Sequence, residues 1–119
     1  MDSLKLIDCI VNTLDDKKAN NIQVIRIDDL TVIGDYFVIA DADNQTHVRS
    51  LVDEVEFQTK QGGRNPRRIE KDESASWIIL DYEDVVVHIF HRPTREFYNL
   101  ENLWSDGETI DMEQFLNKE

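Results

Sequence analysis

Two carboxylates near the middle of the chain have the spacing of a metal-binding pair. Asp41 and Asp43 follow the apolar run 36–40, which is typical of a strand covered on both faces. Side chains two residues apart on a strand point the same way, so the pair could hold magnesium on a nucleotide phosphate for nucleotidyl transfer. Such a pair normally follows a Gly-Ser phosphate loop, whereas here Gly34 precedes Asp35, whose carboxylate repels phosphate. The alternative interpretation is a polar strand end.

Histidines offer a second possible chemistry, which is metal coordination. His88 lies in an expected strand and His91 lies beyond its end, so the two rings need not converge, and His47 is distant in the sequence. A structural zinc site needs four ligands and a catalytic one needs three. Motifs for nucleophilic catalysis, phosphate binding or dinucleotide binding are missing from the sequence. We therefore predict no catalytic residue, no metal and no cofactor, and expect His88 to hydrogen-bond across the sheet.

An aromatic cluster in one quarter of the chain points to protein binding. Its members are Trp77, Tyr82, Phe97, Tyr98 and Trp104. Trp and Tyr join a large apolar body to a polar tip and are enriched in protein interfaces. On a strand, Trp77, Ile79 and Asp81 share one face. If helices cover the other face, the first two stay partly exposed beside the carboxylate. The alternative is that the aromatic residues fill a small core.

The charge balance restricts the class of partner. The 119 residues include 25 acidic and 13 basic side chains, a formal net charge of -12. This excess argues against binding a nucleic-acid backbone or an anionic membrane, because both require Lys and Arg. It suits a basic protein partner, although the charge could also serve only solubility. Cys9 is the single cysteine, and no apolar run approaches the roughly 20 residues that span a bilayer. We expect a cytoplasmic protein.

The order of the expected elements predicts the fold class. Helix, strand, strand, helix, then two or three strands and a helix indicate an α/β (α+β) fold: a mixed sheet of about five strands with helices packed on it. The expected elements are a helix capped by Ser3, strands at 22–28 and 36–40, a helix at 44–63, an edge strand at 67–70, hairpin strands at 77–82 and 85–90, and a helix from Pro93 to Asn99. We expect one domain at 1–104 and a tail at 105–119, either a short helix or a disordered end.

Five segments together resemble the ribosomal silencing factor (Iojap) family over about residues 4 to 104. They are the apolar first helix, Asp35-Tyr-Phe-Val-Ile-Ala40, His47-Val-Arg49, the hairpin from Trp77 to Phe90, and the run from Arg95 to Trp104. The resemblance implies a nucleotidyltransferase-like outline. The chain departs from the family pattern at three places. Asp41-Ala42 replaces a small residue and a Gly, Glu83 replaces a Gly in the hairpin turn, and the Glu-Gly pair expected before Trp77 is not evident at Lys71-Asp72.

The resemblance implies a non-enzymatic translational repressor. Such a protein is a homodimer when free and binds the large ribosomal subunit through a universal ribosomal protein, the fourteenth in its series. It thereby sterically blocks association with the small subunit. Carried onto this chain, the partner-binding residues are Trp77, Ile79, Asp81, Tyr82, His88, Tyr98 and Trp104. Trp77 would be the anchor, Asp81 would meet basic groups, and Tyr82 and His88 would position the hairpin.

Overall fold

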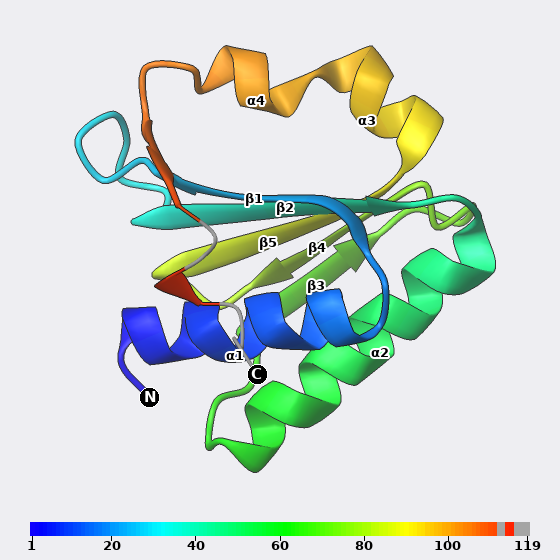
Figure 1. The fold of residues 1–119 in the computed structure, drawn as a ribbon, viewed down its shortest axis with the longest axis horizontal. Coiled ribbons are helices and arrows are strands. Elements are labelled where there is room, and N and C mark those ends of the chain that lie inside the picture. Colours follow the sequence, from blue (N-terminus) through cyan, green and yellow to red (C-terminus); the bar gives the residue numbers. More distant parts are fainter. Residues whose placement is uncertain (112–113, 116–119) are drawn as a thin grey trace.

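A mixed β-sheet separates two layers of helices in the computed structural model of the chain, which describes residues 1–111 and 114–115 (Figure 1). The elements in chain order are α1 (Ser3–Asp16), β1 (Asn20–Arg26), β2 (Tyr36–Ala42), α2 (Gln45–Gln61), β3 (Arg68–Lys71), β4 (Trp77–Asp81), β5 (Val85–His91), α3 (Arg92–Tyr98), α4 (Leu100–Leu103) and β6 (Glu108–Ile110). The strands lie in the order β3-β4-β5-β2-β1-β6. The predicted α/β (α+β) class with a mixed sheet is confirmed.

The register of the central strands decides which residues meet. β2 and β5 pair in parallel, and the other neighbouring strands pair antiparallel. A parallel pair needs a crossover connection, which α2, β3 and β4 supply. Tyr36 pairs with Val85, whereas Asp41 pairs with Phe90, and Trp77 pairs with the same Phe90 from β4. Asp41 and Trp77 therefore lie near one end of the sheet, and the β4–β5 turn lies at the other.

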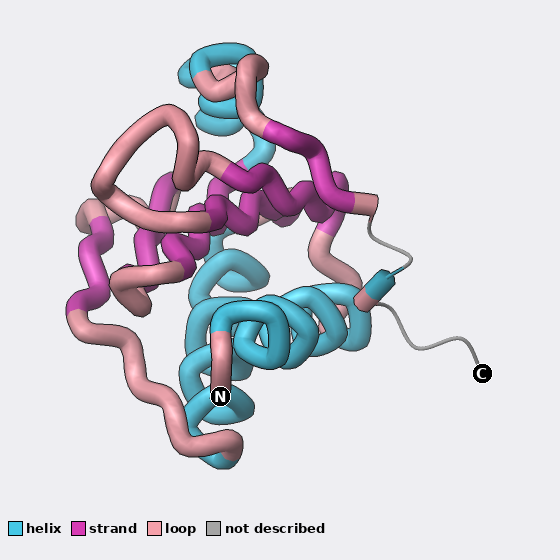
Figure 2. The backbone as a smooth tube through the Cα atoms, turned by 90° about the vertical axis from the view of Figure 1, so that its left-hand side faces the viewer, coloured by secondary structure: helices cyan, strands magenta, loops and turns pink. Residues whose placement is uncertain are grey.

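The first helical layer, α1 and α2, covers one face of the sheet (Figures 1 and 2). Apolar residues recur three or four positions apart on both helices, so they gather on one side of each. Leu6, Ile10 and Leu14 of α1 and Leu51 and Val55 of α2 have no exposed surface. Their burial against the β-branched strands forms the larger core and removes the apolar side chains from water.

The helix caps explain where α1 and α2 begin. The Asp2 carboxylate accepts a hydrogen bond from the Lys5 amide at 2.8 Å, so the predicted cap at Ser3 is wrong by one residue. Ser3 donates its hydroxyl to Asp84 instead. The predicted cap of the second helix is confirmed, because the Asn44 side chain accepts from the His47 amide at 2.8 Å.

The second layer, α3 and α4, covers the other face less completely. A smaller core of Ile27, Phe37, Ile39, Phe90 and Leu100 lies beneath these short helices, and Trp77, Ile79 and Trp104 pack against it while half-buried. None of the helices among the described residues is long and apolar enough to cross a bilayer. The incomplete cover leaves aromatic side chains at the surface of this face.

The structure of the C-terminal segment differs from two predictions. Residues 108–110 form β6, which pairs antiparallel with β1, so the sheet has six strands rather than about five. Expecting a helix or a disordered end there was therefore wrong for these residues, while 112–113 and 116–119 lie outside the described residues. Gly107 permits this pairing, since a Cβ there would lie 2.6 Å from Ile25 Cγ2 and 2.7 Å from the Arg26 carbonyl oxygen. Phe115 is also buried, against the larger core.

Candidate functional site

Pairing of β4 with β5 places Trp77 among three aromatic neighbours. Its indole N–H donates a hydrogen bond to Nδ1 of His88 at 3.1 Å. Its ring stacks on Phe90 at a centroid distance of 4.9 Å and contacts Tyr98 of α3 at 4.8 Å. Trp77 is half-buried rather than exposed, so it serves as the floor of a site whose outer wall is α3.

His88 lies beneath Trp77 and is neutral at physiological pH. It is 5% exposed, and burial lowers its pKa to about 4. Since Nδ1 accepts from the indole, the ring proton is on Nε2, which is buried without a hydrogen-bond partner among the described residues. The imidazole instead meets the Phe37 ring edge-on at 4.6 Å. The predicted hydrogen bond across the sheet is confirmed, and Trp77 is its donor.

A groove of about 720 Å³ separates β4 from α3. We call it the aromatic groove and define it by Trp77, Ile79, Phe97 and Tyr98. Phe97 is 81% exposed and Tyr98 is 53% exposed, although both are large apolar residues. The charged residues that line the groove are Glu70, Lys71 and Asp72. An exposed aromatic surface with excess negative charge is suited to a basic protein partner.

A buried ion pair fastens α3 to the sheet. Arg95 is 7% exposed, and its Nη1 lies 2.9 Å from Asp41 Oδ2 and donates to the Asn21 carbonyl oxygen. Pro93 lies in the first turn of this helix, and Asn99 ends it in the left-handed conformation with φ 48°. The position of Tyr98 on the aromatic groove therefore depends on the contact between Arg95 and Asp41.

The predicted metal pair is thus already neutralised by guanidinium groups. Asp41 is 1% exposed. Arg92 Nε donates to Asp41 Oδ1 at 3.2 Å, and the Asn21 side-chain amide donates to Asp41 Oδ2, the oxygen that Arg95 also contacts. Arg92 also reaches the exposed Asp43 at 2.6 Å. Among the described residues, no three His, Cys, Asp or Glu side chains are placed to hold a metal ion. The residues do not fit magnesium, so the geometry gives nucleotidyl transfer no support.

Two other predicted residues, Asp81 at the end of β4 and Tyr82 in the turn after it, lie outside the aromatic groove. Tyr82 is 3% exposed, its hydroxyl bonds to Thr59 at 2.8 Å, and burial raises its pKa to about 12. Burial alone would raise the pKa of Asp81, but the Glu83 amide and the Arg67 guanidinium outweigh it and hold the pKa below its usual value. Tyr82 therefore offers no surface to a partner, and the charge of Asp81 is already paired.

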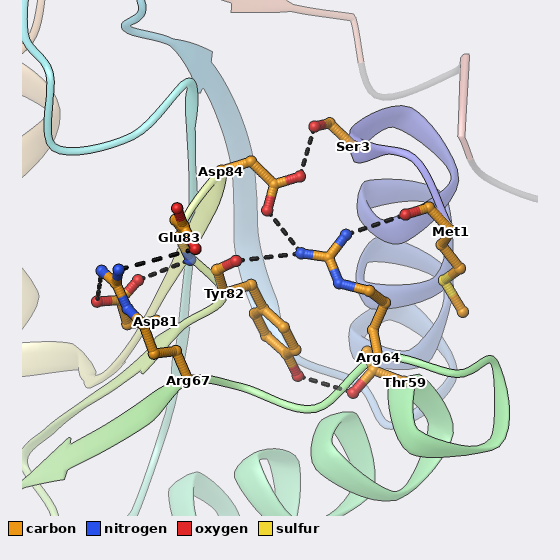
Figure 3. A network of polar contacts seen from close by, with 9 residues as sticks. All are labelled: Met1, Ser3, Thr59, Arg64, Arg67, Asp81, Tyr82, Glu83 and Asp84. Atoms are coloured by element: carbon orange, nitrogen blue, oxygen red, sulfur yellow. Dashed lines mark hydrogen bonds and ion pairs between the residues drawn. The ribbon is translucent and has the colours of Figure 1, made fainter.

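The β4–β5 turn is held by a polar network that was not predicted (Figure 3). Arg64 donates to Asp84 Oδ1 at 2.7 Å, to the Tyr82 carbonyl at 3.1 Å and to the Met1 carbonyl at 3.0 Å. Glu83 takes φ 82°, the left-handed conformation that favours glycine. Glu83, where the family pattern has Gly, therefore places a side chain at a backbone conformation that suits Gly.

The remaining predicted residue, Trp104, follows α4 and is half-buried. Its ring meets Phe37 edge-on at a centroid distance of 5.4 Å, and it does not line the aromatic groove. Phe97 does line it, although it was predicted only as a member of the aromatic cluster. Pro93 in the first turn of α3 was the available signal, because it indicated that Phe97 lies on the same short helix as Tyr98.

Comparison with known proteins identifies relatives over the whole fold. The family described as "Ribosomal silencing factor during starvation" (RsfS) matches residues 1–119. The chain is 34% identical over 117 residues to ribosomal silencing factor RsfS of Halalkalibacterium halodurans, covering 98% of this chain and 100% of that protein. It is 33% identical to the protein of the same name from Bacillus subtilis, covering 87% and 88%. A crystal structure of a Chromobacterium violaceum protein superposes with a TM-score of 0.85 at 27% identity, covering 93% and 92%.

Proposed function

The chain belongs to the ribosomal silencing factor family, and we propose that it represses translation by binding the large ribosomal subunit. Its contact is the universal ribosomal protein that is fourteenth in the series, and the bound chain blocks association with the small subunit. The names of the relatives point to a regulatory factor rather than an enzyme. The protein acts in the cytoplasm, where it meets ribosomes, and is a homodimer when free.

The observation that carries this proposal is the exposed aromatic pair beside a half-buried tryptophan. Phe97 and Tyr98 together present two large rings to solvent, and Trp77 lies beneath Tyr98. Interface energy concentrates in such aromatic residues when a partner removes them from water. Trp77 and Ile79 supply the floor of the contact and Tyr98 its wall, while Trp104 supports the same face of the sheet from α4.

The rest of the predicted site supports the contact from within. His88 orients Trp77, and Tyr82 and Asp81 shape the hairpin turn. The mechanism is steric and needs no chemical step. A body of 32 × 31 × 30 Å, standing on a surface that the small subunit must approach, keeps the two subunits apart. The negative charge speeds the encounter with a basic ribosomal protein.

The test is sedimentation with isolated large subunits through a sucrose gradient. We expect the wild-type chain to migrate with the large subunit and to do so less at high salt. Phe97→Glu with Tyr98→Glu should return the chain to the top of the gradient, because both side chains are exposed and carry little of the fold. Phe57→Glu is the matched control, since Phe57 is 55% exposed on α2, on the opposite helical layer. A wild-type chain that stays at the top at moderate salt would contradict the proposal.

A further inference from the structure

A second exposed apolar feature lies on the loop between β1 and β2, which projects beyond the strands (Figures 1 and 2). Leu30, Val32 and Ile33 are 44%, 102% and 55% exposed. We call residues 28–35 the apolar loop. Resting on the proposed function, we infer that this loop is a second contact with the large subunit, inserting Val32 and Ile33 into an apolar recess on a basic protein surface.

The apolar loop is preorganised at its base. The Ile27 amide donates to the Asp35 carbonyl at 2.8 Å, and the Leu30 and Thr31 amides both donate to the Ile27 carbonyl. The Ile33 amide donates to the Thr31 hydroxyl at 3.3 Å. Ile27 itself is fully buried, so the loop is tied to the core while its tip is not. A partner therefore meets a loop that is already shaped, which lowers the entropy cost of binding.

The Val32 side chain contributes nothing measurable to this fold. Its exposure of 102% means that the fold removes no part of it from water. Single exposed apolar residues are ordinary, but three within four consecutive positions form a patch that typically marks an interaction site. Packing within the described residues therefore does not account for Val32, and the patch is suited to contact with another molecule.

Charges around the apolar loop select a basic protein as its occupant. Asp29 and Asp35 are exposed, and neither carboxylate lies within ion-pair distance of a basic group of residues 1–111 and 114–115. Val32 also shares a shallow hollow of about 420 Å³ with Asp35, Glu83, Asp84 and Arg64, and the last two are paired with each other. Anionic membranes and nucleic acids are repelled by this surface. A second copy would bring the same acidic excess to this loop, so a basic protein is the better electrostatic complement.

The apolar loop and the aromatic groove meet different parts of the partner. The loop precedes Tyr36, which pairs with Val85, whereas Trp77 pairs with Phe90. Five residues of strand separate those two positions along β5, a distance of about 16 Å. Two contacts this far apart on one rigid sheet fix the orientation of the bound chain, which a single contact would leave free to rotate.

The test compares Val32→Ser with Ile33→Ser, made together, against Phe57→Ser as the control. Ile33 and Phe57 are each 55% exposed, so the control removes an exposed apolar side chain from a different place on the surface. Binding to isolated large subunits is measured by sedimentation over a range of subunit concentrations. We expect the double variant to bind about tenfold more weakly, which is the effect of burying one or two such side chains. The control should bind as the wild type does.

A photo-crosslinking amino acid placed at position 32 then reports the neighbour. We expect it to label a protein of the large subunit. Equal binding by the wild type and the double variant would overturn the inference while leaving the proposed function intact. Labelling of ribosomal RNA or of a second copy of the chain would overturn it too. A wild-type chain that fails to bind large subunits would instead remove the proposed function, and the inference with it.

Discussion

The indole N–H of Trp77 donates to Nδ1 of His88 at 3.1 Å, across neighbouring strands of the sheet. This bond requires a neutral ring with its proton on Nε2, and burial of His88, which lowers its pKa to about 4, keeps the ring neutral at neutral pH. The bond orients a ring that also stacks on Phe90 and contacts Tyr98. A buried residue without access to a partner thus determines how the floor of the aromatic groove is presented.

Replacing His88 should therefore change the environment of Trp77. In His88→Asn the side-chain oxygen sits near the position of Nδ1 and can still accept from the indole, whereas His88→Leu offers no acceptor. We expect the leucine variant to bind large subunits about threefold to tenfold more weakly, in line with one neutral hydrogen bond. The indole N–H resonance of Trp77 should move upfield in His88→Leu and stay close to its place in His88→Asn. Identical resonances and affinities in both variants would show that the acceptor is irrelevant.

Acid should destabilise the fold partly through His88. Its pKa is about 4 when folded and 6.5 when unfolded, so the folded state disfavours the charged ring. The contribution of neutral His88 to the free energy of unfolding is therefore complete above pH 6.5 and is lost as the pH falls towards 4. Its upper limit is about 3 kcal/mol. Urea unfolding of the wild type and His88→Asn at pH 7, 5.5 and 4.5 measures this loss. The variant should lose less stability over this range, and parallel curves would contradict the assignment.

Strands with a strong local pattern of apolar and β-branched residues could be predicted from the sequence. Val85 to Phe90 is β-branched and apolar throughout, and the structure has a buried strand there. In contrast, β6 contains Glu108 and Thr109, which are exposed and carry no alternating pattern. Its strand character comes from pairing with β1, more than eighty residues earlier, and from the close approach that Gly107 allows. Such a partner cannot be read from a local pattern.

The same limit applies to the candidate site. Asp41 resembled a metal ligand because its ion-pair partner, Arg95, is 54 residues away and the sequence does not show that the two meet. Only the parallel register of β2 and β5 brings α3 above Asp41. Trp77 and Ile79 were placed correctly, since strand alternation alone assigns them to one face. The sequence could not show that Tyr82 would be sealed against α2 by Thr59.

Glycine at position 83 should stabilise the protein. Glu83 has φ 82°, where a side chain is strained and glycine is not. We expect Glu83→Gly to raise the free energy of unfolding by about 1 kcal/mol and the midpoint temperature of thermal unfolding by about 4 °C. Glu83→Ala is the control, because it also removes the exposed ion pair with Arg67 but keeps the strain. Thermal unfolding followed by circular dichroism tests this, and equal midpoints for Gly and Ala would exclude backbone strain as the cause.

Breaking the ion pair beneath α3 should weaken both stability and binding. Arg95→Met leaves the Asp41 carboxylate buried with only Arg92 and Asn21 beside it, and the loss of one buried partner typically costs about 3–5 kcal/mol. Adding Asp41→Leu removes the stranded charge, so the double variant should be less destabilised than the sum of the single variants. Urea unfolding of all four proteins measures the coupling. Arg95 attaches α3 to the sheet, and Tyr98 lies on the same helix. Arg95→Met should therefore also bind large subunits more weakly at a temperature where it remains folded. Additive effects on stability, together with unchanged binding, would show that α3 is held by its apolar contacts instead.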